Sequence, residues 1–285
     1  MMPDNTFKRS SIVAIWVWLT LFALLPNLLV LMTSLMQQGD NELVRLQLTL
    51  NNYWELFDAT YFKIFWHSID IAAVCTLVCL VIGYPFAYFL ARTESRYKAI
   101  LLFLVIIPFW TSSLIRSYAI VAILKTHGIL NSVLLDLGLI TQPLHLLYSG
   151  VAVIVGLVYS LLPFMILPLY ANIEKLDIRL IDAARDLGAN RMRVFIRIIL
   201  PLTLPGIIAG SMLVFLPAMS MFFIPDLLGG AKTMLVGNLI QNQFMSARNW
   251  PIGSAVSIIL TALMGLMLVI YWRISKNRKE QQGLL

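Results

Sequence analysis

Charged side chains are scarce in this sequence. Only 12% of the 285 residues are charged and 60% are apolar, whereas soluble domains average about 25% and about 45–50%. The surface of a soluble protein grows almost as fast as its volume, so a chain of this length could not hide so much apolar surface from water. The composition excludes an ordinary soluble domain and favours an integral membrane protein.

Sequence patterns typical of enzymes are missing as well. The chain has no G-x-x-x-x-G-K-[ST] phosphate loop, no G-x-S-x-G elbow and no H-E-x-x-H pair, and His67, His127 and His145 are isolated. We therefore expect no catalytic residue, no metal site and no cofactor in this chain. If ATP powers its activity, ATP and Mg²⁺ must bind to a separate ATPase.

Cysteine is almost absent too. Cys75 and Cys79 are the only two, and four residues apart on one helix they stack on the same face, where a disulfide has poor geometry. We expect both to serve as small apolar residues in a helix interior.

Windows without charge, in contrast, are long and numerous. A helix needs ~20 apolar residues to cross the hydrocarbon core, where it satisfies its own backbone groups. The windows predict an all-α membrane protein, a single domain over residues 1–285, with six spans: Ser10–Gly39, Ile71–Ala91, Ala99–Leu124, Gly150–Ala171, Ile198–Pro225 and Ile252–Trp272. The first apolar run, Ile12–Met32, exceeds the about 7–15 residues of a signal-peptide core, so we expect an uncleaved helix.

The net positive charge follows from this topology. Short loops rich in Lys and Arg stay in the cytoplasm, and placing both termini inside collects 15 of the 21 Lys and Arg residues there. The inner side then carries +8 and the remainder −1, so the overall +7 predicts no nucleic-acid partner. The first outer loop, 33–70, is acidic through Asp40, Glu42, Glu55, Asp58 and Asp70.

The inner loop 174–197 has the strongest pattern in the chain, with ten of the 35 formal charges. Asp177 is a good N-cap, Gly188 stands where a helix ends in the left-handed conformation, and Asn190 can cap a second short helix, Arg191–Ile199. Between them, one helix face carries Leu180, Ala183, Ala184 and Leu187. Such a helix could lie on lipid headgroups, but two adjacent alanines anchor weakly in lipid and let another protein backbone approach, which favours docking of a protein.

This loop resembles the EAA motif of bacterial ABC importer permeases, which reads Glu-Ala-Ala, three residues, Gly, nine residues and Ile-x-Leu-Pro. The sequence reads Asp182-Ala183-Ala184, then Gly188, then Ile198-Ile199-Leu200-Pro201, with every spacing kept. Asp for Glu at the first position is the one departure, and it keeps the charge.

The resemblance implies the type I importer (MetI-like) permease fold in a bacterial inner membrane. It also implies the partners: a homologous second permease in a heterodimer, two copies of an ABC ATPase and an extracytoplasmic substrate-binding protein. In this family the loop is a coupling helix that docks on the ATPase. The resemblance thus assigns coupling to Asp182, Ala183, Ala184, Leu187, Gly188 and Leu180.

A narrower resemblance concerns the solute. The stretches Gly83–Ala87, Pro108–Arg116 and Asp226–Gly230 look like those of spermidine/putrescine importer permeases, so the expected solute is a polyamine. The alternatives are an amino acid, an opine or a metal carried by the same class of permease. An ion-coupled secondary transporter would need paired acids inside the spans and internal repeats, and a membrane enzyme would need a catalytic cluster; neither pattern occurs.

A polyamine path should offer carboxylates and aromatic faces to the ammonium groups. The candidates are Trp110 in the middle of the third predicted span, Asp226 with Phe222 and Phe223 at the end of the fifth, Tyr53 in the outer loop and Tyr271 at the end of the sixth span. Asp226 could instead pair with Arg116 as part of the structure. Arg116 would repel a polyamine, and we interpret it as an ion-pair partner or a contact for the binding protein.

Overall fold

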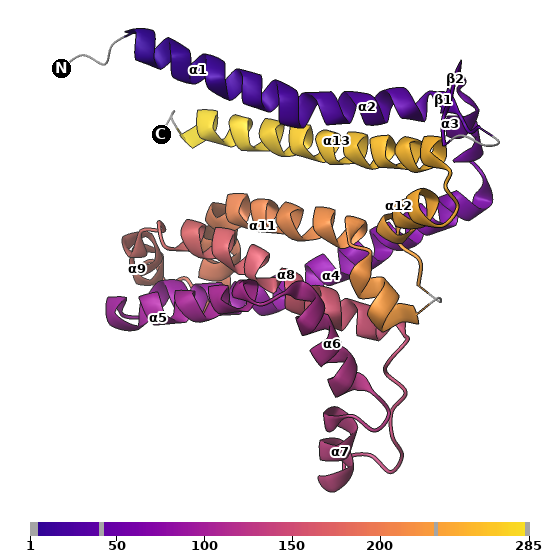
Figure 1. The fold of residues 1–285 in the computed structure, drawn as a ribbon. Coiled ribbons are helices and arrows are strands. Elements are labelled where there is room, and N and C mark those ends of the chain that lie inside the picture. The colour runs from indigo at the N-terminus through magenta and orange to yellow at the C-terminus, as the bar shows by residue number, and fades with distance from the viewer. Residues whose placement is uncertain (1–4, 40–42, 231–232, 283–285) are drawn as a thin grey trace. The chain divides into compact units, whose positions relative to one another are not determined.

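The computed structural model describes residues 5–39, 43–230 and 233–282, and these are mainly helical. The elements, labelled in Figure 1, are α1 Asn5–Leu19, η1 Thr20–Leu24, α2 Leu25–Ser34, β1 Met36–Gln37, β2 Arg45–Leu48, α3 Asn51–Glu55, α4 Ala59–Arg92, α5 Ser95–Ile106, η2 Ile107–Trp110, α6 Ser113–Leu124, α7 Ile129–Asp136, α8 Gly150–Ile173, α9 Ile178–Asp186, α10 Arg191–Val194, η3 Phe195–Ile199, α11 Leu200–Ser220, η4 Pro225–Gly229, α12 Val236–Met245 and α13 Trp250–Gln282.

Six stretches are long and apolar enough to cross a membrane, which confirms the predicted number. They are Arg9–Ser34, Ala59–Arg92, Ser113–Asp136, Gly150–Ile173, Arg191–Ser220 and Trp250–Arg273. The fourth and sixth match the predicted windows closely. The second is longer, because Asp70 and Lys63 lie within α4 and not in a loop.

The third predicted span, Ala99–Leu124, is wrong as a single helix. The helix leaves α5 through the short 3₁₀ turn η2 and stops at Thr111, whose backbone is extended. Both the backbone N–H and the hydroxyl of Thr111 donate to the carbonyl of Pro108. Since Pro108 itself has no N–H to continue the helical pattern, the chain ends one helix here and begins α6 in a new direction (Figure 1).

The fifth predicted span, Ile198–Pro225, is also displaced. The helix starts earlier, at Arg191, and runs through α10, η3 and α11 to Ser220. The short helix predicted over Arg191–Ile199 is therefore present, but it continues into the span without a break. Met221 is extended, and the chain turns again into η4 with Pro225 in its first turn. Proline is well accommodated there, because first-turn N–H groups have no intrahelical partner.

Wide π turns precede two prolines of the spans at the same offset. In η1 the N–H of Leu25 donates to the carbonyl of Thr20, and Pro26 follows; in η3 the N–H of Leu200 donates to the carbonyl of Phe195, and Pro201 follows. A proline clashes with the carbonyl four residues earlier, and widening the preceding turn relieves this clash.

The chain divides into two compact units, Met1–Lys63 with Leu239–Gly265 and Ile64–Asn238 with Leu266–Leu285. The core of the second unit is the packing of α8 on α11, which run side by side in Figure 1. A fully buried stripe on α8 recurs every four residues, which is one helix face: Leu157, Leu161, Met165, Leu169 and Ile173.

The G-x-x-x-G face of α11, Gly206 and Gly210, is the contact that allows this packing. A Cβ at Gly210 would lie 2.8 Å from Met165 Sδ, and one at Gly206 would lie 2.7 Å from Asn172 Cβ. Both distances are too short for any larger side chain without movement of α8. The two glycines therefore set how closely α11 approaches α8.

In the first unit, a small two-stranded antiparallel sheet, β1 with β2, follows α2. This sheet was not predicted. Asn52, buried at the start of α3, donates to the carbonyl oxygens of Ser34 (2.8 Å) and Met36 (2.7 Å) and so fixes the end of α2 to α3. Of the acids predicted in this segment, Asp40 and Glu42 lie outside the described residues.

Candidate functional site

Helix α9, which is predicted to lie on the inner side, forms as its sequence predicts. Asp177 Oδ1 accepts from the N–H of Arg179 (3.0 Å) at its start. At its end Gly188 has φ +81°, its N–H donates to the carbonyl of Arg185 (2.8 Å), and the N–H of Ala189 donates to that of Ala184 (3.0 Å). These two bonds make a Schellman C-cap, which needs a left-handed residue and therefore favours glycine.

Asn190 caps the next helix as predicted, since its Oδ1 accepts from the N–H of Arg193 (2.8 Å). That helix continues without a break into the fifth span. The loop is thus a helix and a tight turn attached directly to a membrane helix.

The predicted face of α9 divides between two surroundings. Ile181 is buried in an apolar cluster with Val194 and Ile199, and Ala184 packs against the same cluster. Leu180, Asp182 and Ala183 are exposed, and Leu187 is 88% exposed. Ile181 was not predicted as the residue that anchors α9 to its own chain. The helical spacing of Ile178, Ile181 and Ala184 could have indicated this buried face. The longer apolar face of Leu180, Ala183, Ala184 and Leu187 was predicted instead.

An ion pair joins the C-terminal end of α8 to the first turn of α5. Lys98 Nζ lies 3.0 Å from Glu174 Oε1. Hydrogen bonds from the hydroxyl of Tyr170 and from Lys98 hold the pKa of Glu174 below its usual range. The pair is partly exposed, so we expect it to orient the helices more than to stabilise them.

A second group of predicted residues gathers where α11 ends. The rings of Phe222 and Phe223 meet edge to face with centroids 5.9 Å apart, and Asp226 lies one turn later. Asp226 is exposed and Phe222 is 42% exposed. Asp226 Oδ1 accepts from the side-chain amide of Asn238, a residue that was not predicted. Sequence offers no signal for it, because a lone Asn twelve positions away has no periodic relation to Asp226.

The glycines beside Asp226 are required by close packing. A Cβ at Gly229 would overlap Thr233 Oγ1. Gly230 has φ +57°, and a Cβ there would lie 3.0 Å from the ring of Tyr148. Larger residues at positions 229 and 230 would not fit this turn without movement of their neighbours, and Gly230 also needs the left-handed backbone that glycine adopts most readily.

Trp110 does not lie in the middle of a helix, contrary to the prediction. It ends η2, is 73% exposed, and packs edge to face on Phe103 with centroids 5.4 Å apart. Its position at the break between α5 and α6 leaves its indole accessible.

Arg116 does not pair with Asp226, which corrects one predicted alternative. Among the described residues it forms no ion pair; its Cζ lies 6.0 Å from the ring centre of Phe109 and 5.9 Å from that of Tyr159. Its Nε and Nη1 are buried without a hydrogen-bond partner in the described part of the chain. Aromatic faces thus take the place of the expected carboxylate.

The remaining two candidates are Tyr53 in the first unit and Tyr271 in the second. The hydroxyl of Tyr53 is 2.7 Å from Ser34 Oγ, so it helps to hold the end of α2. Tyr271 is half-buried near the end of the span formed by α13. Within the described part of the second unit, the structure brings together Phe222, Phe223 and Asp226 from the predicted pathway set.

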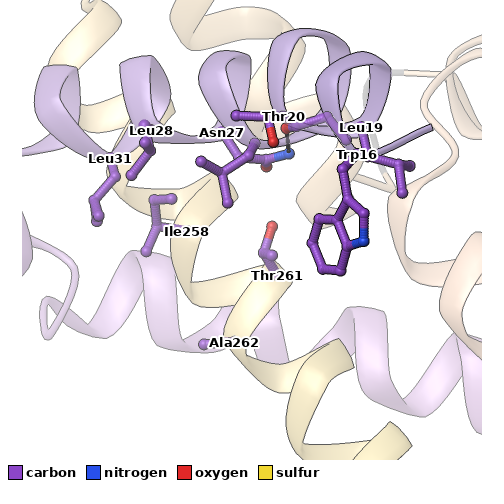
Figure 2. Close-up of a pocket in the computed structure, with 11 residues that line it drawn as sticks. Trp16, Leu19, Thr20, Asn27, Leu28, Leu31, Ile258, Thr261 and Ala262 are labelled. Carbon is purple, nitrogen blue, oxygen red and sulfur yellow. Dashed lines mark hydrogen bonds between the residues drawn. The ribbon is translucent and has the colours of Figure 1, made fainter. Parts of the chain in front are cut away.

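A groove of about 630 Å³ in the first unit is a different kind of surface. Figure 2 shows Trp16, Leu28 and Leu31 projecting from the first span towards Ile258 and Thr261 of α13. No charged residue lines the groove. It therefore offers nothing to compensate a polycation.

The match to known proteins covers most of the chain. Residues 83–279 match the family described as "Binding-protein-dependent transport system inner membrane component". The chain belongs to this family. The membership places a multi-pass transport component in an inner membrane and agrees with the six apolar stretches.

Among members of this binding-protein-dependent family, the chain is 53% identical over 281 residues to the "Spermidine/putrescine transport system permease protein PotB" of Salmonella typhimurium (strain SL1344), covering 98% of both chains. It is 54% identical over 272 residues to the protein of the same name from Escherichia coli (strain K12), covering 95% of this chain and 99% of the relative.

The fold is also that of ABC importers. A chain from the crystal structure of a "bacterial alginate ABC transporter in complex with alginate pentasaccharide-bound periplasmic protein" superimposes with a TM-score of 0.77 at 15% identity, covering 96% of this chain and 95% of that one. Alginate is an acidic polysaccharide, so the fold of this family does not by itself select the charge of the solute.

Proposed function

We propose that this chain is a permease subunit of an ATP-driven ABC importer for polyamines. The observation that carries the proposal is the 53% identity to a spermidine/putrescine permease over 98% of both chains.

The chain itself supplies half of the path and no ATP hydrolysis. A homologous second permease completes the path, two copies of an ATPase bind ATP and Mg²⁺, and a loaded extracytoplasmic protein delivers the solute. The family description names a binding-protein-dependent system, and the alginate neighbour is an ABC transporter in complex with a periplasmic protein. These support the binding protein and the ATPase, and the resemblance of the inner loop to the EAA motif supports the second permease and the two ATPase copies. The termini and the loop 174–197 lie in the cytoplasm, as the distribution of Lys and Arg supports.

The mechanism follows from the two sites. The exposed residues Leu180, Ala183 and Leu187 meet the ATPase, and movement of α9 passes through Ile181 and its cluster to α10 and α11. At the other end of α11, Asp226 forms no ion pair among the described residues and lies beside the exposed ring of Phe222. A carboxylate with an adjacent aromatic face is suited to an alkylammonium group.

Reconstitution of the whole importer in liposomes tests the function. ATP hydrolysis should rise when a spermidine-loaded binding protein is added outside and should not rise with the same protein loaded with an amino acid. Asp226→Asn should reduce spermidine uptake about tenfold, the usual scale for a lost charged contact, while basal ATP hydrolysis stays unchanged. Stimulation by another loaded binding protein, with none by spermidine, would refute the polyamine assignment.

A further inference from the structure

Asn238 lies in the first turn of α12 and is only 5% exposed. Its side chain makes three hydrogen bonds. Oδ1 accepts from the N–H of Leu235 (3.1 Å), and Nδ2 donates to the carbonyl of Phe222 (2.7 Å) and to Asp226 Oδ1. One buried amide therefore joins the start of α12, the end of α11 and the carboxylate on η4.

The backbone leaves this amide only one orientation. An N–H can only donate, so the atom facing Leu235 must be the amide oxygen; a carbonyl can only accept, so the atom facing Phe222 must be the amide nitrogen. The second hydrogen of that nitrogen then points to Asp226. The bond to the carboxylate follows from two backbone contacts and does not depend on a free choice of rotamer.

This arrangement holds Asp226 without neutralising it. The donor is an uncharged amide, and no Lys or Arg in the described part of the chain pairs with the carboxylate. Oδ2 has no hydrogen-bond partner among the described residues, and Asp226 is exposed. A lysine or arginine in place of Asn238 would hold the same group but cancel its charge.

We propose that Asn238 is a positioning residue for Asp226: its buried amide fixes the carboxylate beside Phe222 with its negative charge intact, so that Oδ2 meets an ammonium group of the polyamine. This inference rests on the proposed polyamine path at Asp226. Fixing the carboxylate beforehand removes the entropy cost of ordering it when the solute arrives.

Ser68 offers a matched control in the same junction. Its hydroxyl donates to the carbonyl of Ile64 (2.7 Å) and accepts from the N–H of Val236 (2.9 Å), one residue from the Leu235 bond. Ser68 is fully buried, and no hydrogen bond joins it to Asp226 in the described part of the chain. Ser68→Ala therefore weakens the start of α12 and leaves the carboxylate held.

The experiment measures spermidine transported per ATP hydrolysed by the complete importer in liposomes, with a spermidine-loaded binding protein. A variant that merely folds less well loses uptake and hydrolysis together, so this ratio stays constant. Asn238→Ala should lower the ratio about tenfold, the scale of one bond to a charged group, and Ser68→Ala should leave it within about twofold. In an Asp226→Asn background, Asn238→Ala should have no further effect.

Exchange of the two residues separates charge from packing. Asp226→Asn with Asn238→Asp keeps a hydrogen bond between the positions but moves the carboxylate into the buried site, and the ratio should stay as low as in Asp226→Asn alone.

A restored ratio in this double variant would overturn the inference, as would equal losses in Ser68→Ala and Asn238→Ala. If Asp226→Asn lowers the ratio while Asn238→Ala does not, Asn238 has no positioning role and the proposed function stands. A normal ratio in Asp226→Asn removes the carboxylate from the path itself.

Discussion

Two single residues, a glycine and a hydrogen-bonded asparagine, set how the end of α11 packs against the start of α12. Gly237, in the first turn of α12, lies against the end of α11 so closely that a Cβ would overlap the carbonyl oxygen of Ser220. Its neighbour Asn238 makes three hydrogen bonds there. The same few atoms thus set both the packing of α12 and the orientation of Asp226.

Replacing Gly237 with Ala should therefore destabilise the protein by about 1–3 kcal/mol, the range for overpacking against backbone. The measurement is the melting temperature of the purified protein in detergent. Gly265→Ala on α13 is the control, because a Cβ there would meet no atom within 4 Å, and alanine has the higher helix propensity. An equal or greater loss of stability in Gly265→Ala would show that the close contact between Gly237 and Ser220 is not what limits stability.

Glu174 gives a dependence on pH at the same scale. Its lowered pKa means that the folded state favours the ionised carboxyl, so its stabilisation is present above the ordinary glutamate pKa, about 4.3, and is lost as pH falls through the lowered value. The melting temperature of Glu174→Gln should lie below that of the unmodified protein at pH 7, and the two should converge as the pH falls through the lowered pKa of Glu174. Lys98→Met should show a similar deficit at pH 7, because it removes the other partner. A constant difference from pH 7 to pH 3 would contradict the ion pair.

At the scale of elements, α9 has two faces with different tasks. The buried face, through Ile181, joins the helix to the cluster with Val194 and Ile199. The other face, with Leu180, Ala183 and Leu187, is exposed in the described part of this chain. Ala184 lies at the border, half-buried against the cluster, so a large residue there would disturb folding as well as docking.

Leu187→Glu should therefore separate docking from folding. We expect the ATPase to stop copurifying with the permease. The free energy of unfolding, followed through the melting temperature, should change by less than about 0.5 kcal/mol, as is usual for exposed positions. Ile181→Glu should lower both, because it buries a charge in the cluster. Leu137→Glu is the control, since Leu137 is similarly exposed but lies outside the inner loop. Normal copurification of Leu187→Glu would rule out this face as the docking surface.

For the whole molecule, the distribution of charge predicts orientation. Fifteen of the 21 Lys and Arg residues fall on the predicted inner side, and the same prediction puts α9 on that side and the α6–α7 segment on the other. The two natural cysteines are buried, so an introduced exposed cysteine can be labelled with little background.

Leu187→Cys should react with a membrane-impermeant maleimide only in inverted vesicles, and Leu137→Cys only in intact cells or right-side-out vesicles. The physical reason is that short positively charged loops remain in the cytoplasm. Labelling measured on gels with and without prior permeabilisation gives the side of each residue. The reverse pattern would invert the topology and place α9 out of reach of an ATPase.

The sequence by itself determined the features that depend on neighbours in the chain. The apolar windows fix the number of spans, and the caps of α9 and α10 follow from Asp177, Gly188 and Asn190, because each cap bonds within five residues. Motif spacing found the inner loop for the same reason. Where prolines interrupted an apolar window, the window alone overestimated the helix, since hydropathy does not record a missing N–H.

Only the tertiary structure decided which residues meet across long separations. Ser68 bonds to Val236, and Asn238 bonds to Asp226 and Phe222, although no periodicity relates these positions. The choice of Ile181 as the buried residue of α9 depends on Val194 and Ile199 beyond the turn. Arg116 rests on aromatic rings and not on an acid. Such contacts arise from how the helices pack, because only this packing brings side chains so distant in the sequence within bonding distance.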